Sequence, residues 1–244
     1  MFNFSKKPKI KFYIHKNRAG AFPPPVPAKS AIPEYYKNAS PFTIDDPVIR
    51  TPQGGATPTG TFKKCMPFLD ALTSGYIIKL HCDVHVKPMD DTGPNFTWTL
   101  SDAAPLSHHS YAQVSAIPGA TSMPGGIPFK WMSPWHIETD PGYSCLIVQP
   151  LNHFEKRWEI LPGVVDTDSY NLQINFPFIW KDRTFHGVIE RGTPIAQIIP
   201  FRRESWQHAV INEDPKQHSN NLLKLSSKVV DAYKTFWWKK KEWN

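Results

Sequence analysis

The chain carries the segment Leu161-Pro-Gly-Val-Val-Asp-Thr-Asp-Ser-Tyr170, in which a Pro-Gly turn precedes a β-branched pair and two acids separated by one residue. Side chains alternate along a strand, so this spacing predicts that Asp166 and Asp168 lie on one face of an extended segment. Two neighbouring carboxylates followed by the aromatic ring of Tyr170 are suited to holding a polar ligand. The segment therefore predicts both a strand and a candidate site.

A second segment, Gly192-Thr-Pro-Ile-Ala-Gln-Ile-Ile199, follows further along the chain. Its three isoleucines favour a strand, and Gln197 is its only polar interruption. This pattern predicts a tight turn that leads into a buried strand. Together the two segments predict one antiparallel unit.

These segments resemble two consecutive motifs of the dUTPase and dCTP deaminase superfamily, whose trimeric β-clip domains carry Gly-Val-Ile-Asp-x-Asp-Tyr and then Gly-Asp-Arg-Ile-Ala-Gln. Weaker matches are Ser74-Gly75-Tyr76 with Asp83, and Asp140-Pro-Gly-Tyr143. The resemblance spans roughly residues 73–202 and implies a β-clip fold and a homotrimer. It also gives Asp166 the place of the water-activating aspartate, and Tyr170 that of the ring that packs against the sugar.

The phosphate-binding residues of this superfamily are missing at the matching positions. Gln149-Pro-Leu-Asn152 stands where an Arg-Ser-Ser or Arg-Ser-Gly motif is expected, and Pro194 stands where the later motif has arginine. Triphosphate chemistry needs cations and N–H donors on the phosphoryl oxygens, and only Gln197 remains of that set. We therefore expect a non-catalytic, dUTPase-like binding or assembly protein that needs no cofactor.

The resemblance assigns four ligand-binding residues, namely Asp166, Asp168, Tyr170 and Gln197. The first alternative is a nucleotide-processing enzyme, a dNTP pyrophosphatase or a deaminase-like protein, that uses Mg²⁺ with its nucleotide and has Asp166 as the catalytic residue. A structural role is the other interpretation of the acids, because short acids beside a Pro-Gly corner often accept hydrogen bonds from turn amides.

A second alternative is a metal site. His81-Cys-Asp83 together with His136 resembles the His-x-Asp…His triad of non-haem iron oxygenases of the 2-oxoglutarate type, in which Arg191 or Arg202 could supply the distal arginine. Such a site would hold Fe²⁺. Three-residue patterns of this kind are common by chance, so we expect surface or hydrogen-bonded histidines and no bound metal.

A broader resemblance covers the whole chain and points to a family from tailed bacteriophages of aquatic bacteria and their hosts, which carries no activity that can be transferred. It implies the host cytoplasm as the location, with the virion as the alternative, and a phage or host protein as a partner besides the chain itself. The motifs that carry it are Lys64-Cys-Met-Pro-Phe-Leu-Asp-Ala71, Pro134-Trp135, Gly142-Tyr-Ser-Cys145, Asn175-Phe-Pro-Phe178 and parts of the two segments above.

Composition favours a mostly β protein. The 244 residues are 40% hydrophobic and 13% aromatic and include 25 prolines, which indicates many short strands, long loops and little helix. We expect a distorted antiparallel barrel or sandwich. Residues 1–60 form an N-terminal strand and Pro-rich arm, residues 61–205 the core with a loop insertion near 88–126, and residues 206–244 a helical tail.

The C-terminal tail is basic and aromatic, and it ends in Phe236-Trp-Trp-Lys-Lys-Lys-Glu-Trp243-Asn244. Leucines and other apolar residues at roughly helical spacing over 221–238 favour a helix that docks on the body or on a neighbouring subunit. Lysines interleaved with tryptophans also suit single-stranded nucleic acid, which stays the alternative partner of the tail. No run of about 18 apolar residues occurs, so we expect no contact with a membrane.

Overall fold

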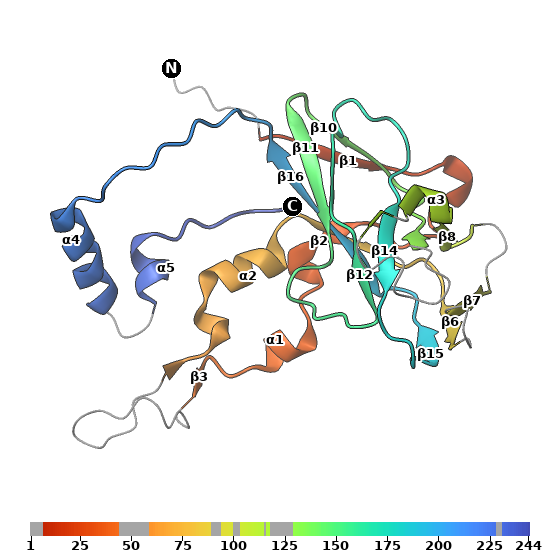
Figure 1. Cartoon of the computed structure of the whole chain (residues 1–244), viewed down its shortest axis with the longest axis horizontal. Helices are drawn as coiled ribbons and strands as arrows, with labels where there is room; N and C mark the ends of the chain where they lie inside the picture. Colours follow the sequence, from red (N-terminus) through yellow and green to blue (C-terminus); the bar gives the residue numbers. More distant parts are fainter. Residues whose placement is uncertain are drawn as a thin grey trace.

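Figure 1 shows the computed structural model of the chain, which describes residues 7–43, 59–88, 94–99, 103–114, 116–117, 129–227 and 231–244. Strands dominate these residues, and all the strand pairs are antiparallel. The strands form five separate sheets, and none of these closes into a barrel. The expectation of a mostly β, antiparallel fold with few helices is confirmed.

The largest sheet contains both segments that opened the sequence analysis. Its order is β13 (Gly163–Val165), β11 (Tyr143–Val148), β16 (Pro194–Arg202), β5 (Tyr76–Lys79) and β2 (Val26–Pro27). Strand β11 lies between the two segments and pairs with β13 on one side and with β16 on the other. The expected antiparallel unit therefore exists, with β11 as its centre.

A second sheet supplies most of the large core side chains. Its order is β12 (Trp158–Ile160), β14 (Phe176–Trp180), β9 (Phe129–Trp131) and β8 (Leu106–His108). Because alternate side chains of a strand point to the same face, Phe176, Phe178 and Trp180 all enter the core and are almost fully buried. They share one hydrophobic cluster with side chains of β11 and β16, so the two sheets pack as a sandwich.

Three smaller sheets complete the described strands. They are β15 (Gly187–Ile189) with β6 (Val84–Lys87) and β7 (Asn95–Trp98); β1 (Ile10–Tyr13) with β10 (His136–Thr139); and β3 (Phe42–Thr43) with β4 (Thr59–Gly60). The expected strand over 75–86 is divided into β5 and β6, because the backbone of Leu80 bonds to Gly192 and Thr193 and the chain turns there. The proposed insertion near 88–126 includes β7, β8 and α3 (Tyr111–Val114), and its remaining parts lie largely outside the described residues.

The described segments before β5 include several short helices. They are the 3-10 turns η1 (Lys16–Arg18), η2 (Ala28–Ser30) and η3 (Phe62–Lys64), and the α-helices α1 (Glu34–Asn38) and α2 (Met66–Thr73). Gln197 on β16 holds α2 in place, since its amide nitrogen donates to the carbonyl oxygens of Ala71 and Ser74 at 3.0 and 2.6 Å. Leu72 of α2 is fully buried.

The C-terminal tail consists of α4 (Pro215–Ser226), α5 (Ala232–Phe236) and an extended end. The expected helix over 221–238 is interrupted, because Asp231 adopts a left-handed backbone conformation with φ 69°. The extended end docks on the body: Trp238 Nε1 donates to the Asp70 carboxylate, Lys241 pairs with the same group at 2.5 Å, and the Trp243 ring packs edge-on against Tyr76. Docking of the tail on its own body is therefore observed, while contact with nucleic acid stays a prediction.

None of the helices in the described parts of the chain is both long enough and apolar enough to cross a bilayer.

Substitution of Gly75 tests how closely β16 approaches the start of β5. Gly75 has φ +67°, and an added Cβ would lie 2.0 Å from the carbonyl oxygen of Ile198. We expect Gly75→Ala to lower the melting temperature much more than Gly20→Ala. Gly20 has φ +83° but open space around it, so only the left-handed backbone cost of about 1–2 kcal/mol applies there. Thermal unfolding followed by circular dichroism measures both, and equal losses would contradict this packing.

Candidate functional site

Asp166 and Asp168 lie in a turn that follows β13. The strand ends at Val165, and the amides of Ser169 and Tyr170 both donate to the carbonyl oxygen of Asp166 at 3.0 and 2.9 Å. The expectation that the two acids share one face of an extended segment is therefore wrong. The chain folds back on itself directly after the β-branched pair, and the turn, not strand alternation, brings the two carboxylates together.

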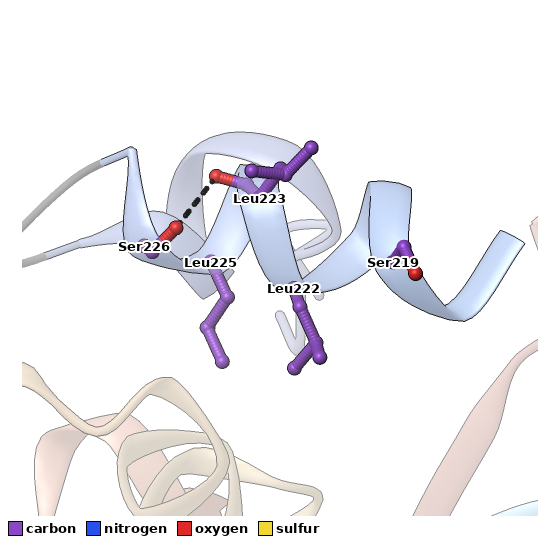
Figure 2. Close-up of a pocket in the computed structure, with 5 residues that line it drawn as sticks. All are labelled: Ser219, Leu222, Leu223, Leu225 and Ser226. Carbon is purple, nitrogen blue, oxygen red and sulfur yellow. Dashed lines mark hydrogen bonds between the residues drawn. The ribbon is translucent and has the colours of Figure 1, made fainter. Parts of the chain in front are cut away.

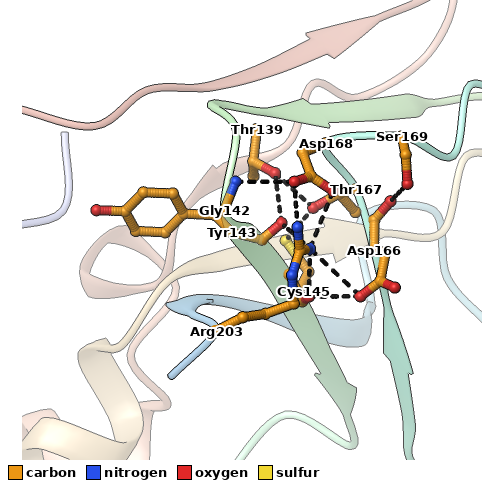
Figure 3. Close-up of polar contacts among 10 residues, drawn as sticks. Thr139, Gly142, Tyr143, Cys145, Asp166, Thr167, Asp168, Ser169 and Arg203 are labelled. Carbon is orange, nitrogen blue, oxygen red and sulfur yellow. Dashed lines mark hydrogen bonds and ion pairs between the residues drawn. The ribbon is translucent and has the colours of Figure 1, made fainter. Parts of the chain in front are cut away.

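Arg203 joins the two acids (Figure 3). Its Nη1 lies 2.9 Å from Asp168 Oδ1 and 3.4 Å from Asp166 Oδ1, and its Nη2 donates to Asp168 Oδ2. A guanidinium that grips both oxygens of one carboxylate makes a stronger and more oriented contact than a single hydrogen bond. Arg203 was not among the predicted site residues, although Arg202 and Arg203 form a basic pair at the end of a predicted strand.

Groups of β11 and of Gly142, the residue before it, complete this acid–arginine cluster. The amide of Gly142 donates to Asp168 Oδ2 at 2.8 Å, and the Ser144 hydroxyl donates to Asp166 Oδ1 at 2.6 Å. Arg203 also donates to the carbonyl oxygen of Tyr143 at 3.0 Å. Asp168 therefore accepts a hydrogen bond from a turn amide, as the structural interpretation expects of a short acid, but the amide is that of Gly142 and not one beside Pro162-Gly163.

The two acids differ in charge environment and exposure. Hydrogen bonds from Arg203 and from the Gly142 amide lower the pKa of Asp168 to about 2. The side chain of Asp168 is 10% exposed, whereas that of Asp166 is 62% exposed. Asp168 is therefore a covered structural group that is ionised at neutral pH, and Asp166 is the carboxylate that a ligand could reach.

Buried hydroxyl groups of two threonines contact each other beneath the surface of the turn that carries Asp166 and Asp168. Thr139 Oγ1 and Thr167 Oγ1 lie 2.8 Å apart, and the Thr167 hydroxyl also lies 3.3 Å from Cys145 Sγ. Burial raises the pKa of the Cys145 thiol to about 11. A thiol that stays protonated at neutral pH is a poor nucleophile, so Cys145 contributes packing here and no reactivity.

Gln197 does not belong to this cluster. Gln197 pairs with Val148 at one end of β11, and Arg202 pairs with Tyr143 at the other end. Five residues separate Tyr143 from Val148, which corresponds to about 16 Å along a strand. The side chain of Gln197 is fully buried, and its amide oxygen accepts from the backbone of Leu151 at 2.7 Å. Of the four predicted ligand-binding residues, the structure joins Asp166 and Asp168, places the half-exposed Tyr170 next to them and uses Gln197 inside the fold.

The proposed metal ligands have other contacts. His81 Nε2 lies 3.1 Å from the carbonyl oxygen of Ala103, and burial lowers the pKa of its ring. Asp83 accepts a hydrogen bond from the backbone of Arg191, and the His136 ring stacks on Tyr13. Within the described ranges no group of three or more His, Cys, Asp and Glu side chains is placed to hold a metal ion. The structure therefore does not bring His81, Asp83 and His136 together.

The chemistry of the cluster follows from these contacts. Arg203 directs both terminal nitrogens at Asp168, so its charge is balanced inside the chain and its best donors are occupied. The exposed Asp166 presents a hydrogen-bond acceptor at the surface. The arrangement can accept hydrogen bonds from a polar partner, and it is not organised as a phosphate clamp, which needs donors that point outward.

No protein-family model matches this sequence, and a search of curated proteins finds no match. Among solved structures, a mutant dUTPase from phage phi11 of S. aureus is similar over 57% of this chain and 84% of its own, with 12% identity and a TM-score of 0.32. A mutant dUTPase of Staphylococcus bacteriophage 80alpha with dUpNHpp is similar over 58% and 78%, with 13% identity and a TM-score of 0.31.

The pH dependence of stability tests the role of Asp168. Its pKa is lower in the folded chain than the ordinary value of 3.8, so its ionised form stabilises the fold above about pH 4, and this contribution is lost as the pH falls towards 2. We expect Asp168→Asn to lower the melting temperature at pH 6 and the difference from the unmodified chain to shrink between pH 4 and pH 2. Asp166→Asn is the matched control, because its exposed side chain predicts a smaller loss. A pH-independent difference would exclude this role of the ion pair.

Proposed function

We propose that this chain is a dUTPase-like binding or assembly protein of phage type that does not hydrolyse nucleotides. The observation that carries the proposal is the pairing of Asp168 with Arg203. This contact joins Asp168, one of the two motif acids, to Arg203, so that neither of these two side chains is directed at a ligand. The phage assignment comes from the sequence resemblance.

The contacts of the Gln197 side chain support the proposal independently. Its amide nitrogen and oxygen bond to α2 and to the loop after β11, which leaves this side chain committed to the fold. Breaking those bonds to contact a phosphate would leave buried backbone groups unsatisfied, at a cost of about 1–3 kcal/mol each. The one group that remained of the superfamily's phosphate-binding set is therefore used as a structural group here.

The alternative, a nucleotide-processing enzyme that works with Mg²⁺, has one observation in its favour. Asp166 is exposed, and the Ser144 hydroxyl fixes one of its oxygens at 2.6 Å. A carboxylate oriented in this way could act as a general base on a water molecule.

A turnover assay separates the two functions. We expect incubation of the chain with dUTP, dCTP or dATP and Mg²⁺ to release no pyrophosphate above background, because the superfamily's phosphate-binding motif is missing and Arg203 is paired with Asp168. Release that disappears in Asp166→Asn and persists in Asp182→Asn, an acid in a different loop, would establish the enzyme instead.

The assembly part of the proposal rests on the arm that leaves the body after β16. In Figure 1 this arm extends away from the sandwich and carries α4 at its far end. Its apolar side chains lack cover, since Trp206, Val210 and Ile211 are 86, 95 and 84% exposed. Apolar surface of this extent on a soluble protein is typical of contact with another chain.

Helix α4 has the same character. Figure 2 shows Leu222, Leu223 and Leu225 on its surface, and all three are at least half exposed. Twelve residues make a marginal helix in water unless an apolar face is covered. We propose that a second copy of the chain covers the side of α4 that carries Leu222 and Leu225 (Figure 2), and the resemblance sets the expected number of copies at three.

Light scattering tests the assembly. We expect a mass of three times 27.9 kDa, and we expect the double substitution Leu222→Glu and Leu225→Glu to shift the protein to a smaller species, because it places charge in an apolar contact. Asn220→Asp, which the helical period of 3.6 residues places on the opposite side of α4 from Leu222 and Leu225, is the matched control and should leave the mass unchanged. A monomer at micromolar concentration would refute the assembly proposal.

A further inference from the structure

Both ends of the described chain meet at one end of the largest sheet and enclose a cavity of about 680 Å³. The N-terminal segment before β1 forms one wall, the end of β16 a second, and the docked tail a third. The cavity adjoins the acid–arginine cluster, since Thr139 and Tyr143 belong to both. Its volume lies within the range of about 300–1,000 Å³ that is usual for small-molecule sites.

The lining of this cavity carries an excess of positive charge. Four of its residues are cations and one is an acid: Lys7, Lys9, Arg202, Lys240 and Glu242. Glu242 is shared, because it lies 3.2 Å from Lys7 and 3.7 Å from Lys240, so that one carboxylate balances two ammonium groups. Arg202 also lies 3.6 Å from Glu204, outside the lining, but both side chains are largely exposed and water weakens this pair. The cavity therefore favours an anion.

Aromatic rings form the rest of its distinctive lining, namely those of Tyr76, Tyr143, Phe201 and Trp243. Trp243 and Tyr76 hold each other edge-to-face with ring centroids 6.4 Å apart, and the Tyr76 hydroxyl donates to the backbone of Asn244 at 3.1 Å. Figure 3 shows the Tyr143 ring projecting away from the acid–arginine cluster. Rings held in this way offer flat apolar surface to a planar ligand at little cost in conformational entropy.

We propose that this cavity binds a small organic anion that carries an aromatic ring, with its phosphate or carboxylate group at the lysines and its ring against Trp243 and Tyr143. Cations and aromatic rings converge here from segments that are distant in sequence, and the docked tail closes the site. This inference deepens the proposed binding function by naming a ligand class and a place for it. It does not depend on the chemistry of Asp166.

Calorimetric titration of the full chain with phenyl phosphate tests the proposal, with inorganic phosphate and phenol as probes of the two halves of the ligand. We expect phenyl phosphate to bind at least tenfold more tightly than either and to bind more weakly as salt is raised, because screening reduces the attraction of the cations. Addition of a single-stranded DNA oligomer in a separate titration distinguishes a nucleic-acid surface from a small-ligand site.

Two substitutions locate the binding in the cavity. Lys240→Gln should weaken phenyl phosphate binding about tenfold, the loss expected for one charge-assisted hydrogen bond, whereas Lys239→Gln, its neighbour outside the lining, should leave binding unchanged. Trp243→Leu should weaken phenyl phosphate binding and leave the affinity for inorganic phosphate unaltered. Circular dichroism confirms that each variant is folded.

Three results would overturn the proposal: no binding of phenyl phosphate at millimolar concentration, equal losses in Lys240→Gln and Lys239→Gln, or binding of single-stranded DNA without binding of phenyl phosphate. The last would make this end of the sheet a nucleic-acid contact. Nucleotide turnover is measured separately and by a different readout, so its result decides the proposed function without affecting this one.

Discussion

The pairing of β11 with β16 is the contact on which the other features depend. Six residue pairs align the two strands, from Tyr143 opposite Arg202 to Val148 opposite Gln197. A shift of one residue in this register would turn the side chains of β16 to the opposite face. The core would then lose Ile198, and α2 would lose the amide of Gln197 that holds it.

The same register sets the position of Arg203. The backbone of Arg203 continues beyond β16 and donates to the carbonyl oxygen of Gly142, which brings the guanidinium beside Asp168. The acid–arginine cluster is therefore a consequence of how two strands end together. It fastens the turn after β13 to the sheet and leaves Asp166 as the exposed acid. The cavity lined by aromatic and cationic side chains lies at the same end of the strands. The acid–arginine cluster and the proposed ligand site are therefore neighbours.

The end of the tail packs on the body of the protein, whereas the arm does not. The end of the tail returns and bonds to Asp70 and Tyr76, which makes it part of the fold and of the cavity wall. The arm extends outward with its tryptophan and leucine side chains exposed. One chain end therefore completes the fold, while the segment before it presents apolar surface. The proposed binding and assembly function would use these two segments differently, the tail for the ligand and the arm for a second copy of the chain.

Much of the strand content could be predicted from local pattern. The apolar residues of Tyr143–Val148 and the isoleucines of Pro194–Arg202 favour strands, whereas the burial of Ser144 and Gln197 does not follow from that pattern. The tail could be predicted to dock, because its tryptophans need a surface. Proline and aromatic content correctly indicated short strands and little helix.

The site depended on contacts that local pattern does not contain. Arg203 lies 35 residues from Asp168, and only the strand register shows that they meet. Gln197 shares a motif with the acids in the resemblance, yet it lies at the far end of the strand and bonds to α2. The turn at Asp166 depends on backbone hydrogen bonds. Local pattern in the sequence predicts which segments favour strands, because strand propensity is a property of short stretches. Which polar side chains are buried, which charges meet and which remain free for a ligand is decided by the tertiary structure, because these depend on how distant strand ends align.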